Sequence, residues 1–429
     1  MEIIKSIERK YWPKFMERPS IENEKLTDIV RSILETVKSK KDKALKKYAL
    51  QFDKVNLDRL EVSAAEIENA ITLVSPELKA AINIAKENIE KFHSAQQSNE
   101  KIVETSPGVK CWRKNVAIEK VGLYIPGGSA PLFSTILMLG IPAKIAGCKE
   151  IVICTPCNSN GDVNPAMLYT ANLIGIKKIY KIGGAQAIAA MAYGTESIPQ
   201  VYKILGPGNQ YVTKAKELVQ QNGTAIDMPA GPSEVLVISD STGNPEFIAA
   251  DLLSQAEHGA DSQVILLSDT ESILDETMLA IARQLEELPR KEIAAQALQN
   301  SKAILFENIE GCIQFSNDYA PEHLIIASES AMEYADGIVN AGSVFLGNYS
   351  CESAGDYASG TNHTLPTNGF AKNYSGVSLD SFVKKITFQE LNKKGILNIG
   401  NAIEIMAEAE QLFAHKNAVS IRLKAINNV

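Results

Sequence analysis

Hydrophobic and polar residues follow a helical period from the start of the chain to about residue 109. One run places hydrophobic residues at helical spacing with charged residues on the opposite face: Ile29, Val30, Ile33, Leu34 and Val37. Ser63 with Glu66, and Ser75 ahead of Pro76, match the signals that start helices. The pattern predicts structural helices here and no chemistry.

From about residue 116 the pattern changes to short β-rich runs that alternate with helical stretches. The runs are 121–125, 151–153, 178–182, 201–205 and 235–238, followed by 264–267, 303–306, 324–326 and 343–346. Strands that alternate with helices predict parallel sheets, so we expect two α/β units in tandem. From about residue 380 the tail returns to a helical pattern.

The composition is that of a globular protein, with 45% hydrophobic and 22% charged residues among 429. A formal charge of −8 gives no basic face for a phosphate backbone and argues against nucleic-acid binding. The uncharged stretch 121–143 is interrupted by Pro126, Pro131 and Pro142, so we predict no membrane helix. The N-terminus builds no signal-peptide run, and we expect a cytoplasmic protein with unpaired cysteines.

Three predicted strand-to-helix turns are rich in glycine, at 125–130, 182–186 and 205–209. Backbone N–H groups at such turns can approach an anion at a helix N-terminus, which suits the pyrophosphate of a dinucleotide. The last turn is followed by Tyr211 where the dinucleotide fingerprint needs a third glycine. Ordinary tight turns of an α/β sheet therefore explain the pattern equally well.

Four of the five histidines lie in polar segments beside other reactive groups. Gln255 and His258 are three residues apart, so one helix face can present both to one ion. A histidine that caps the helix before Gly259 fits the spacing as well. Glu322 and His323 precede a predicted strand, where they suit general acid/base chemistry or form a solvated turn.

A loop rich in glycine and hydroxyl groups follows the predicted strand 343–346. Asp356 in this loop can complete a nitrogen and oxygen metal site with Gln255 and His258. His363 can hydrogen-bond a substrate. The alternative is an Asx-type turn that satisfies its own backbone.

Five residues have simple structural interpretations when they are judged by spacing alone. Glu410 and His415 lie on the predicted C-terminal helix, where we place both on the surface. Cys154 and Cys157 have C-x-x-C spacing but no second cysteine pair to complete a zinc knuckle. His93 ends an amphipathic helix and is most simply its C-terminal cap.

Long runs after about residue 105 resemble the histidinol dehydrogenase family. They are Val121-Gly-Leu-Tyr-Ile-Pro-Gly-Gly-Ser-Ala-Pro-Leu, Ile226-Asp-Met-Pro-Ala-Gly-Pro-Ser-Glu-Val-Leu, Leu253-Ser-Gln-Ala-Glu-His-Gly, Gly355-Asp-Tyr-Ala-Ser-Gly-Thr-Asn-His and Ala414-His-Lys-Asn-Ala-Val. The resemblance implies one zinc ion per subunit of a homodimer, with ligands Gln255, His258, Asp356 and, from the partner subunit, His415. It implies that NAD contacts Tyr124, Gln186 and Asn209. The implied substrate contacts, besides the zinc ligands, are Ser233, Glu322, His323, His363 and Glu410, the last also supplied across the interface.

The activity implied by the resemblance is oxidation of L-histidinol through L-histidinaldehyde to L-histidine with two NAD+. His323 would act as the base and Glu322 would activate water for the second oxidation. A zinc-dependent hydrolase that uses Glu322 and His323 for water activation is the alternative, and it needs no dinucleotide. A protein that only sequesters a ligand would need neither residue.

The family's fold implies two Rossmann-like domains with small helical N- and C-terminal additions. We expect a helical extension over 1–25 and a first Rossmann-like domain, with the metal and catalytic residues, over 26–120 and 236–375. The second, with the NAD edge, would be inserted at 121–235. A helical domain over 376–429 would reach the partner subunit.

Overall fold

The computed structural model describes residues 1–5, 7–19, 24–98, 101–127, 131–229 and 231–427. Positions 128–130 of the first glycine-rich turn and position 230 in the run 226–236 lie outside this range. The chain divides into two compact units. The first comprises Met1–Ala95 and Ile118–Phe382, and the second comprises Gln96–Ala117 and Val383–Val429.

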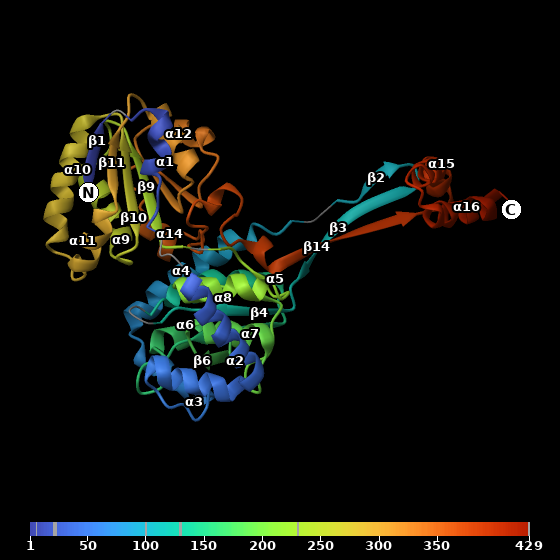
Figure 1. The fold of residues 1–429 in the computed structure, drawn as a ribbon, viewed down its shortest axis with the longest axis horizontal. Coiled ribbons are helices and arrows are strands. Elements are labelled where there is room, and N and C mark those ends of the chain that lie inside the picture. The colour runs from blue at the N-terminus through green and yellow to red at the C-terminus, as the bar shows by residue number, and fades with distance from the viewer. Residues whose placement is uncertain (6, 20–23, 99–100, 128–130, 230, 428–429) are drawn as a thin grey trace. The chain divides into compact units, whose positions relative to one another are not determined.

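The larger sheet of the first unit is parallel throughout (Figure 1). Its strands, in spatial order, are β1 (Glu2–Lys5), β11 (Lys302–Leu305), β10 (Gln263–Ser268), β9 (Glu234–Ser239), β12 (His323–Ala327) and β13 (Ser343–Leu346). Every residue of β9, β10 and β12 is buried. Helices cover both faces of a parallel sheet, which explains why these strands are continuous hydrophobic runs.

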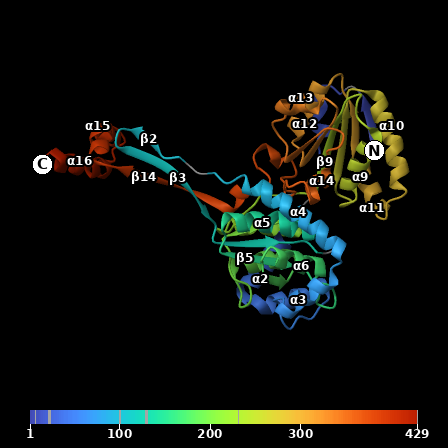
Figure 2. The same ribbon diagram turned by 180° about the vertical axis from the view of Figure 1, so that it is seen from behind.

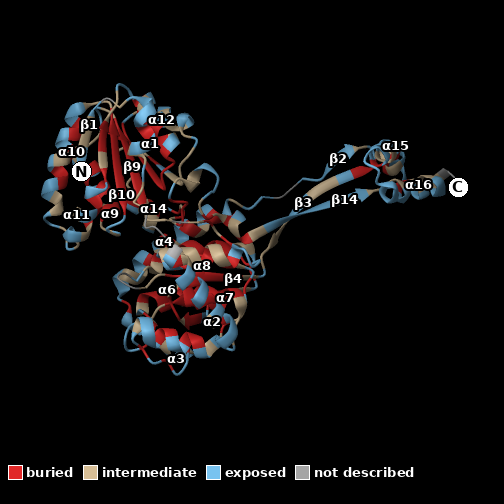
Figure 3. Ribbon diagram, viewed as in Figure 1, coloured by how far each residue is buried: buried red, intermediate tan, exposed pale blue. Residues whose placement is uncertain are grey.

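Alternate residues of β9 enter different hydrophobic clusters, one on each face of the larger sheet. One cluster takes in α9 (Pro245–Ala256), α10 (Glu271–Leu285) and α11 (Lys291–Gln299). The other takes in α1 (Trp12–Phe15), α12 (Ile309–Tyr319) and α13 (Ala331–Tyr334). Figure 3 shows the buried residues concentrated along the strands.

The smaller sheet is also parallel and has a Rossmann-like strand order. In spatial order its strands are β6 (Lys178–Lys181), β5 (Glu150–Thr155), β4 (Lys120–Tyr124), β7 (Lys203–Leu205) and β8 (Ala225–Ile226). The α/β class and all the strand runs predicted from sequence are thus confirmed. Strand order reverses between β4 and β7, where sheets of this type bind ligands.

The helices before residue 95 differ from the expected domain division, because they pack on the smaller sheet. One cluster includes α2 (Glu24–Tyr48), α7 (Gly184–Tyr193) and α8 (Gln210–Gln220). The other, in view in Figure 2, includes α3 (Ala64–Leu73), α4 (Pro76–Ser94), α5 (Phe133–Ala146) and α6 (Pro165–Leu173). The expected division placed 26–120 with 236–375, whereas the helices before residue 95 belong with the smaller sheet of the same unit. The expected helical extension 1–25 also contributes β1 to the larger sheet.

The second unit contains an antiparallel sheet that the sequence pattern did not predict. Its strands are β14 (Val383–Leu391), β3 (Val109–Ala117) and β2 (Val103–Ser106), followed along the chain by α15 (Lys393–Ala409) and α16 (Phe413–Asn427). The tail after residue 380 is therefore not wholly helical. Most of β14 is exposed on both faces, so its sequence lacks the sustained hydrophobic run or alternation of a buried strand.

Local signals read from the sequence are present in the first unit. Ser63 and Glu66 form a capping box at α3, and Ser75 caps α4 with Pro76 at its first position. The uncharged stretch 121–143 forms most of β4 and the first part of α5. Within the described ranges, no helix has the length and apolar character needed to cross a membrane.

Candidate active site and metal centre

The candidate site gathers at the edge of the larger sheet where its strands begin. Ser233 directly precedes β9, and His323 is the first residue of β12. His258 lies two residues beyond the end of α9, on the segment that leads into β10. Because parallel strands share their amino-terminal edge, residues far apart in the sequence meet here.

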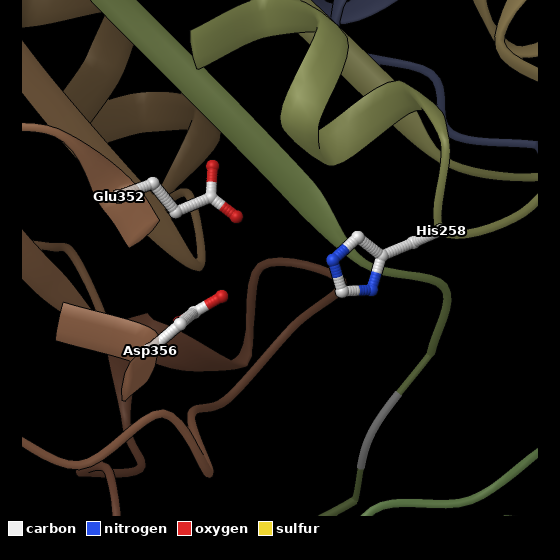
Figure 4. A group of neighbouring side chains, drawn as sticks. All are labelled: His258, Glu352 and Asp356. Atoms are coloured by element: carbon white, nitrogen blue, oxygen red, sulfur yellow. The ribbon is translucent and has the colours of Figure 1, made fainter. Parts of the chain in front are cut away.

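Three side chains at this edge are arranged to hold a metal ion. His258, Glu352 and Asp356 each offer a ligand atom, and these atoms lie within 4.8 Å of one another. Glu352 and Asp356 are four residues apart on α14 (Glu352–Tyr357), and Figure 4 shows both carboxylates directed toward the imidazole. The expected loop at 352–357 is thus a helix, and Asp356 is not confined to an Asx turn.

Gln255 supports the same interpretation. It lies in the last turn of α9, three residues before His258, and both polar atoms of its buried amide lack a partner in the described structure. A buried amide without a partner is rare, because it costs the desolvation of both groups. Nitrogen and oxygen donors of this kind are the ligands that zinc accepts. The donor set therefore fits the ion implied by the sequence resemblance.

Glu352 is the residue that the sequence analysis missed. It is almost fully buried, and one of its carboxylate oxygens has no partner among the described residues. Its spacing of four from Asp356 would have identified it, had the segment been predicted as a helix.

Three carboxylates surround His323. Its Nδ1 lies 3.7 Å from Glu322 and 3.8 Å from Glu352, and its Nε2 lies 3.5 Å from Asp356. Burial alone would lower the pKa of His323, but the negative charges of Glu352, Glu322 and Asp356 outweigh it and raise that pKa to about 10. The ring therefore carries a proton when no cation balances these charges.

Glu322 is also buried, which rules out the solvated turn considered for this pair. Burial raises the pKa of Glu322 to about 7, while the charge of His323 and the hydrogen bond from the backbone N–H of Glu234 limit this increase. That N–H donates to Glu322 Oε2 at 3.0 Å. A carboxyl group that titrates near neutral pH can accept or release a proton during a reaction.

A buried ionic cluster fixes the strand end behind Glu322. The Glu234 carboxylate accepts hydrogen bonds from Arg18 Nε and from the Tyr319 hydroxyl, both at 2.6 Å. The Arg18 guanidinium also lies over the Tyr319 ring, 3.8 Å from its centroid. These contacts fix the position of Glu234, whose backbone holds Glu322.

The residues predicted to contact NAD lie at the carboxyl edge of the smaller sheet. Tyr124 ends β4, Gln186 is buried in the first turn of α7, and Asn209 caps α8. The Tyr124 hydroxyl accepts a hydrogen bond from the N–H of Gly184 at 3.1 Å. Gly206 has a φ of +129°, and a Cβ there would lie 2.1 Å from the Tyr124 carbonyl oxygen, so this close approach requires glycine.

One cavity joins the two edges. It has a volume of about 430 Å³ and is lined by Asn209 from the smaller sheet and by Ser233 and His258 from the larger one. Gly208 and Asn209 of the glycine-rich turn and His258 of the candidate metal centre therefore line the same space.

Four of the residues discussed from sequence lie elsewhere. Glu410 directly follows α15 and His415 lies in α16, both exposed and both in the second unit. Their roles at the site stay predictions. Burial raises the pKa of Cys154 well above its usual value and that of Cys157 to about 11, as expected for incidental thiols.

His93 lies in the last turn of α4, as its interpretation as a C-terminal cap implies. It is fully buried near the end of α4, and its Nε2 lies 3.5 Å from the side-chain amide of Asn362. It therefore packs against the segment that leads to His363.

These features define an α/β enzyme in which a candidate metal centre adjoins a Rossmann-like edge. The histidinol dehydrogenase family model matches residues 16–423. The chain is 59% identical over 426 residues to histidinol dehydrogenase of Bacteroides thetaiotaomicron and 60% identical over 426 residues to that of Bacteroides fragilis, covering 99% of this chain and 100% of each relative. The crystal structure of histidinol dehydrogenase from Elizabethkingia anophelis superposes with a TM-score of 0.98 at 63% identity, covering 100% of this chain and 99% of the other.

The chain therefore belongs to the histidinol dehydrogenase family and is an oxidoreductase. The family inferred from the sequence runs is confirmed.

Proposed function

We propose that the protein oxidises L-histidinol through L-histidinaldehyde to L-histidine, using zinc and two NAD+. The observation that carries the proposal is the juxtaposition of the group His258, Glu352 and Asp356 with His323, beside a cavity that reaches the edge predicted to bind NAD. The names of the similar proteins supply the substrate.

Gln255, His258 and Asp356 would hold the zinc ion, together with the partner subunit's His415, and Glu352 is a further donor within reach. Zinc bound here would hold the amine and imidazole of histidinol, while NAD+ serves as the hydride acceptor. Tyr124, Gln186 and Asn209 would contact NAD. The unpartnered amide of Gln255 supports this set, because a bound cation gives its oxygen a partner.

His323 is the group that removes the hydroxyl proton of histidinol as hydride leaves the neighbouring carbon. A base must be unprotonated, whereas the surrounding carboxylates raise the pKa of His323 to about 10. A divalent cation held beside Asp356 would offset their charge and lower this pKa toward neutrality. Binding of the metal would therefore favour the unprotonated form of His323 that can act as the base.

Glu322 is the group that activates water. With a pKa near 7, it can take a proton from water as the oxygen adds to the aldehyde carbon. The proton that His323 took in the first step goes to the carbonyl oxygen, which gives the hydrate and leaves His323 free to act as base again. The hydrate loses its proton to His323 and its hydride to a second NAD+. The overall balance is histidinol, two NAD+ and one water to histidine, two NADH and protons.

Ser233 would contact the substrate from this chain, and Glu410 would reach it from the partner of a homodimer. The predicted contact of His363 would run through its ring carbons, because both ring nitrogens are bonded within the chain. Ser233 lines the shared cavity, which supports its role. Glu410 and His415 are exposed in the chain, as residues that serve a neighbouring subunit would be. A biosynthetic function supports the cytoplasm as the compartment.

Metal removal tests the proposal. The purified protein is stripped with a chelator and assayed for NADH formation from histidinol and NAD+, then titrated with zinc. We expect no activity without metal and a maximum near one zinc per subunit. Full activity in protein shown to be metal-free would contradict the proposal, and hydrolysis of an amide without NAD+ would favour the hydrolase.

A further inference from the structure

The segment after α14 is attached to α5 at two successive residues. His363 Nε2 lies 3.0 Å from the hydroxyl of Thr135, and the Asn362 amide nitrogen donates to the backbone carbonyl of Met138 at 2.6 Å. Thr135 and Met138 are three residues apart and lie on one face of α5. Thr135 is fully buried, so its hydroxyl cannot bind water instead.

Pro142 explains why α5 can accept the hydrogen bond from Asn362 at the Met138 carbonyl. In a regular helix the carbonyl of Met138 accepts from the N–H of residue 142, but proline has no N–H to donate. The carbonyl is therefore free to accept from Asn362. A proline inside a buried helix normally destabilises it, and here the vacated acceptor binds the loop that carries His363.

The two bonds to the His363 ring determine where its proton sits. Nδ1 lies 2.9 Å from the backbone carbonyl oxygen of Asp356, which can only accept, so Nδ1 carries the hydrogen. In the neutral ring Nε2 is then an acceptor, and the Thr135 hydroxyl donates to it. The Asp356 carbonyl thus selects the tautomer, and the Thr135 hydroxyl holds the ring where its Nδ1–H meets that carbonyl.

We propose that Thr135 is a positioning residue, which acts through His363 to fix Asp356 and thereby the metal centre. The expected effect of Thr135 on turnover rests on the proposed function, whereas its expected effect on the His363 ring does not. Met138 and Pro142 complete the attachment by supplying a free carbonyl for the neighbouring Asn362.

Three variants test the hydroxyl. Thr135→Val keeps the shape of the side chain and removes the hydroxyl donor, whereas Thr135→Ser keeps the donor. Thr170→Val is the matched control, because Thr170 is a buried threonine whose hydroxyl donates to the Ala166 carbonyl within its own helix. In the zinc-loaded enzyme, we expect Thr135→Val to lower kcat/KM for histidinol about tenfold, the value of one hydrogen bond. The serine variant and the control should stay within about twofold.

The ring gives a second readout that is independent of turnover. In protein labelled with ¹⁵N-histidine, the His363 Nε2 of the wild type and of Thr135→Ser should show the upfield shift of a ring nitrogen that accepts a hydrogen bond, and that of Thr135→Val should lose it. Pro142→Ala offers a separate approach should the valine variant misfold, since it returns an N–H that competes with Asn362 for the Met138 carbonyl. It should lower kcat/KM while the helix is retained.

Unchanged kinetics and an unchanged Nε2 shift in Thr135→Val would overturn the proposal. So would a serine variant as impaired as the valine variant, because packing would then be the cause. A wild type that makes no NADH from histidinol would contradict the proposed function instead, and the Nε2 shift would still decide the role of Thr135.

Discussion

Replacing Glu352 by Gln should lower the pKa of His323 in the metal-free protein. The substitution keeps the shape of the side chain and removes one of the three charges around the ring. Two unit charges 3.8 Å apart, at an effective dielectric constant of about 20, interact by roughly 4 kcal/mol, or about three pKa units. Relaxation and the remaining carboxylates reduce this, so we expect a fall of about one to three units.

The direction of the change in the His323 pKa follows from which state of the ring is charged. Glu352 stabilises the protonated ring, so its loss makes His323 release its proton at a lower pH. The proton signals of ¹⁵N-labelled histidine give the pKa directly, and a His323→Asn spectrum assigns the resonance. Glu329→Gln is the control, since Glu329 is an exposed carboxylate just beyond β12, the strand that begins at His323, and should leave the value unchanged.

A His323 pKa that moves by less than about half a unit in Glu352→Gln would refute the reasoning. It would mean that the carboxylate is protonated or turned away from the ring. A comparable shift in Glu329→Gln would show that the effect comes from net charge.

Three further predictions concern the base, the shared centre and the ionic cluster. His323→Asn should lower kcat by orders of magnitude while zinc stays bound, because it removes a base and no ligand; full activity would contradict its role. His415→Asn should weaken zinc binding. Heterodimers that combine this variant with His258→Asn should regain activity, because one of their two metal centres keeps all its ligands. Inactive heterodimers, once subunit exchange is shown, would argue against a metal centre shared between subunits. Arg18→Met should lower the free energy of unfolding in urea by about 3 kcal/mol by stranding the buried Glu234 carboxylate. Adding Glu234→Gln should recover part of that loss, and no recovery would contradict the pairing.

The two parallel sheets were predictable because their strands are buried on both faces. Continuous hydrophobic runs such as 235–238 and 264–267 follow directly from that burial. The exposed strand Val383–Leu391 lacks this signature and was missed. The helices between residues 24 and 94 were predicted, but their periodicity does not say which sheet they cover, and they were assigned to the wrong one.

The candidate site was predictable to the extent that its residues have distinctive chemistry. Asp356, His258 and His323 were identified from residue type and local context, and the structure brings them together. Glu352 was missed because the segment around it was predicted as a loop. Thr135 and Arg18 have no local signature at all, since their roles depend on contacts with residues more than 200 positions away.

The stoichiometry of the reaction tests the central claim most directly. Zinc-loaded protein is given excess NAD+ and a limiting, known amount of L-histidinol, and the NADH formed is measured at completion. The proposed roles of His323 and Glu322 predict two NADH for each histidinol. One NADH would mean release of the aldehyde and contradict the hydration role of Glu322, and none would contradict the proposed function itself.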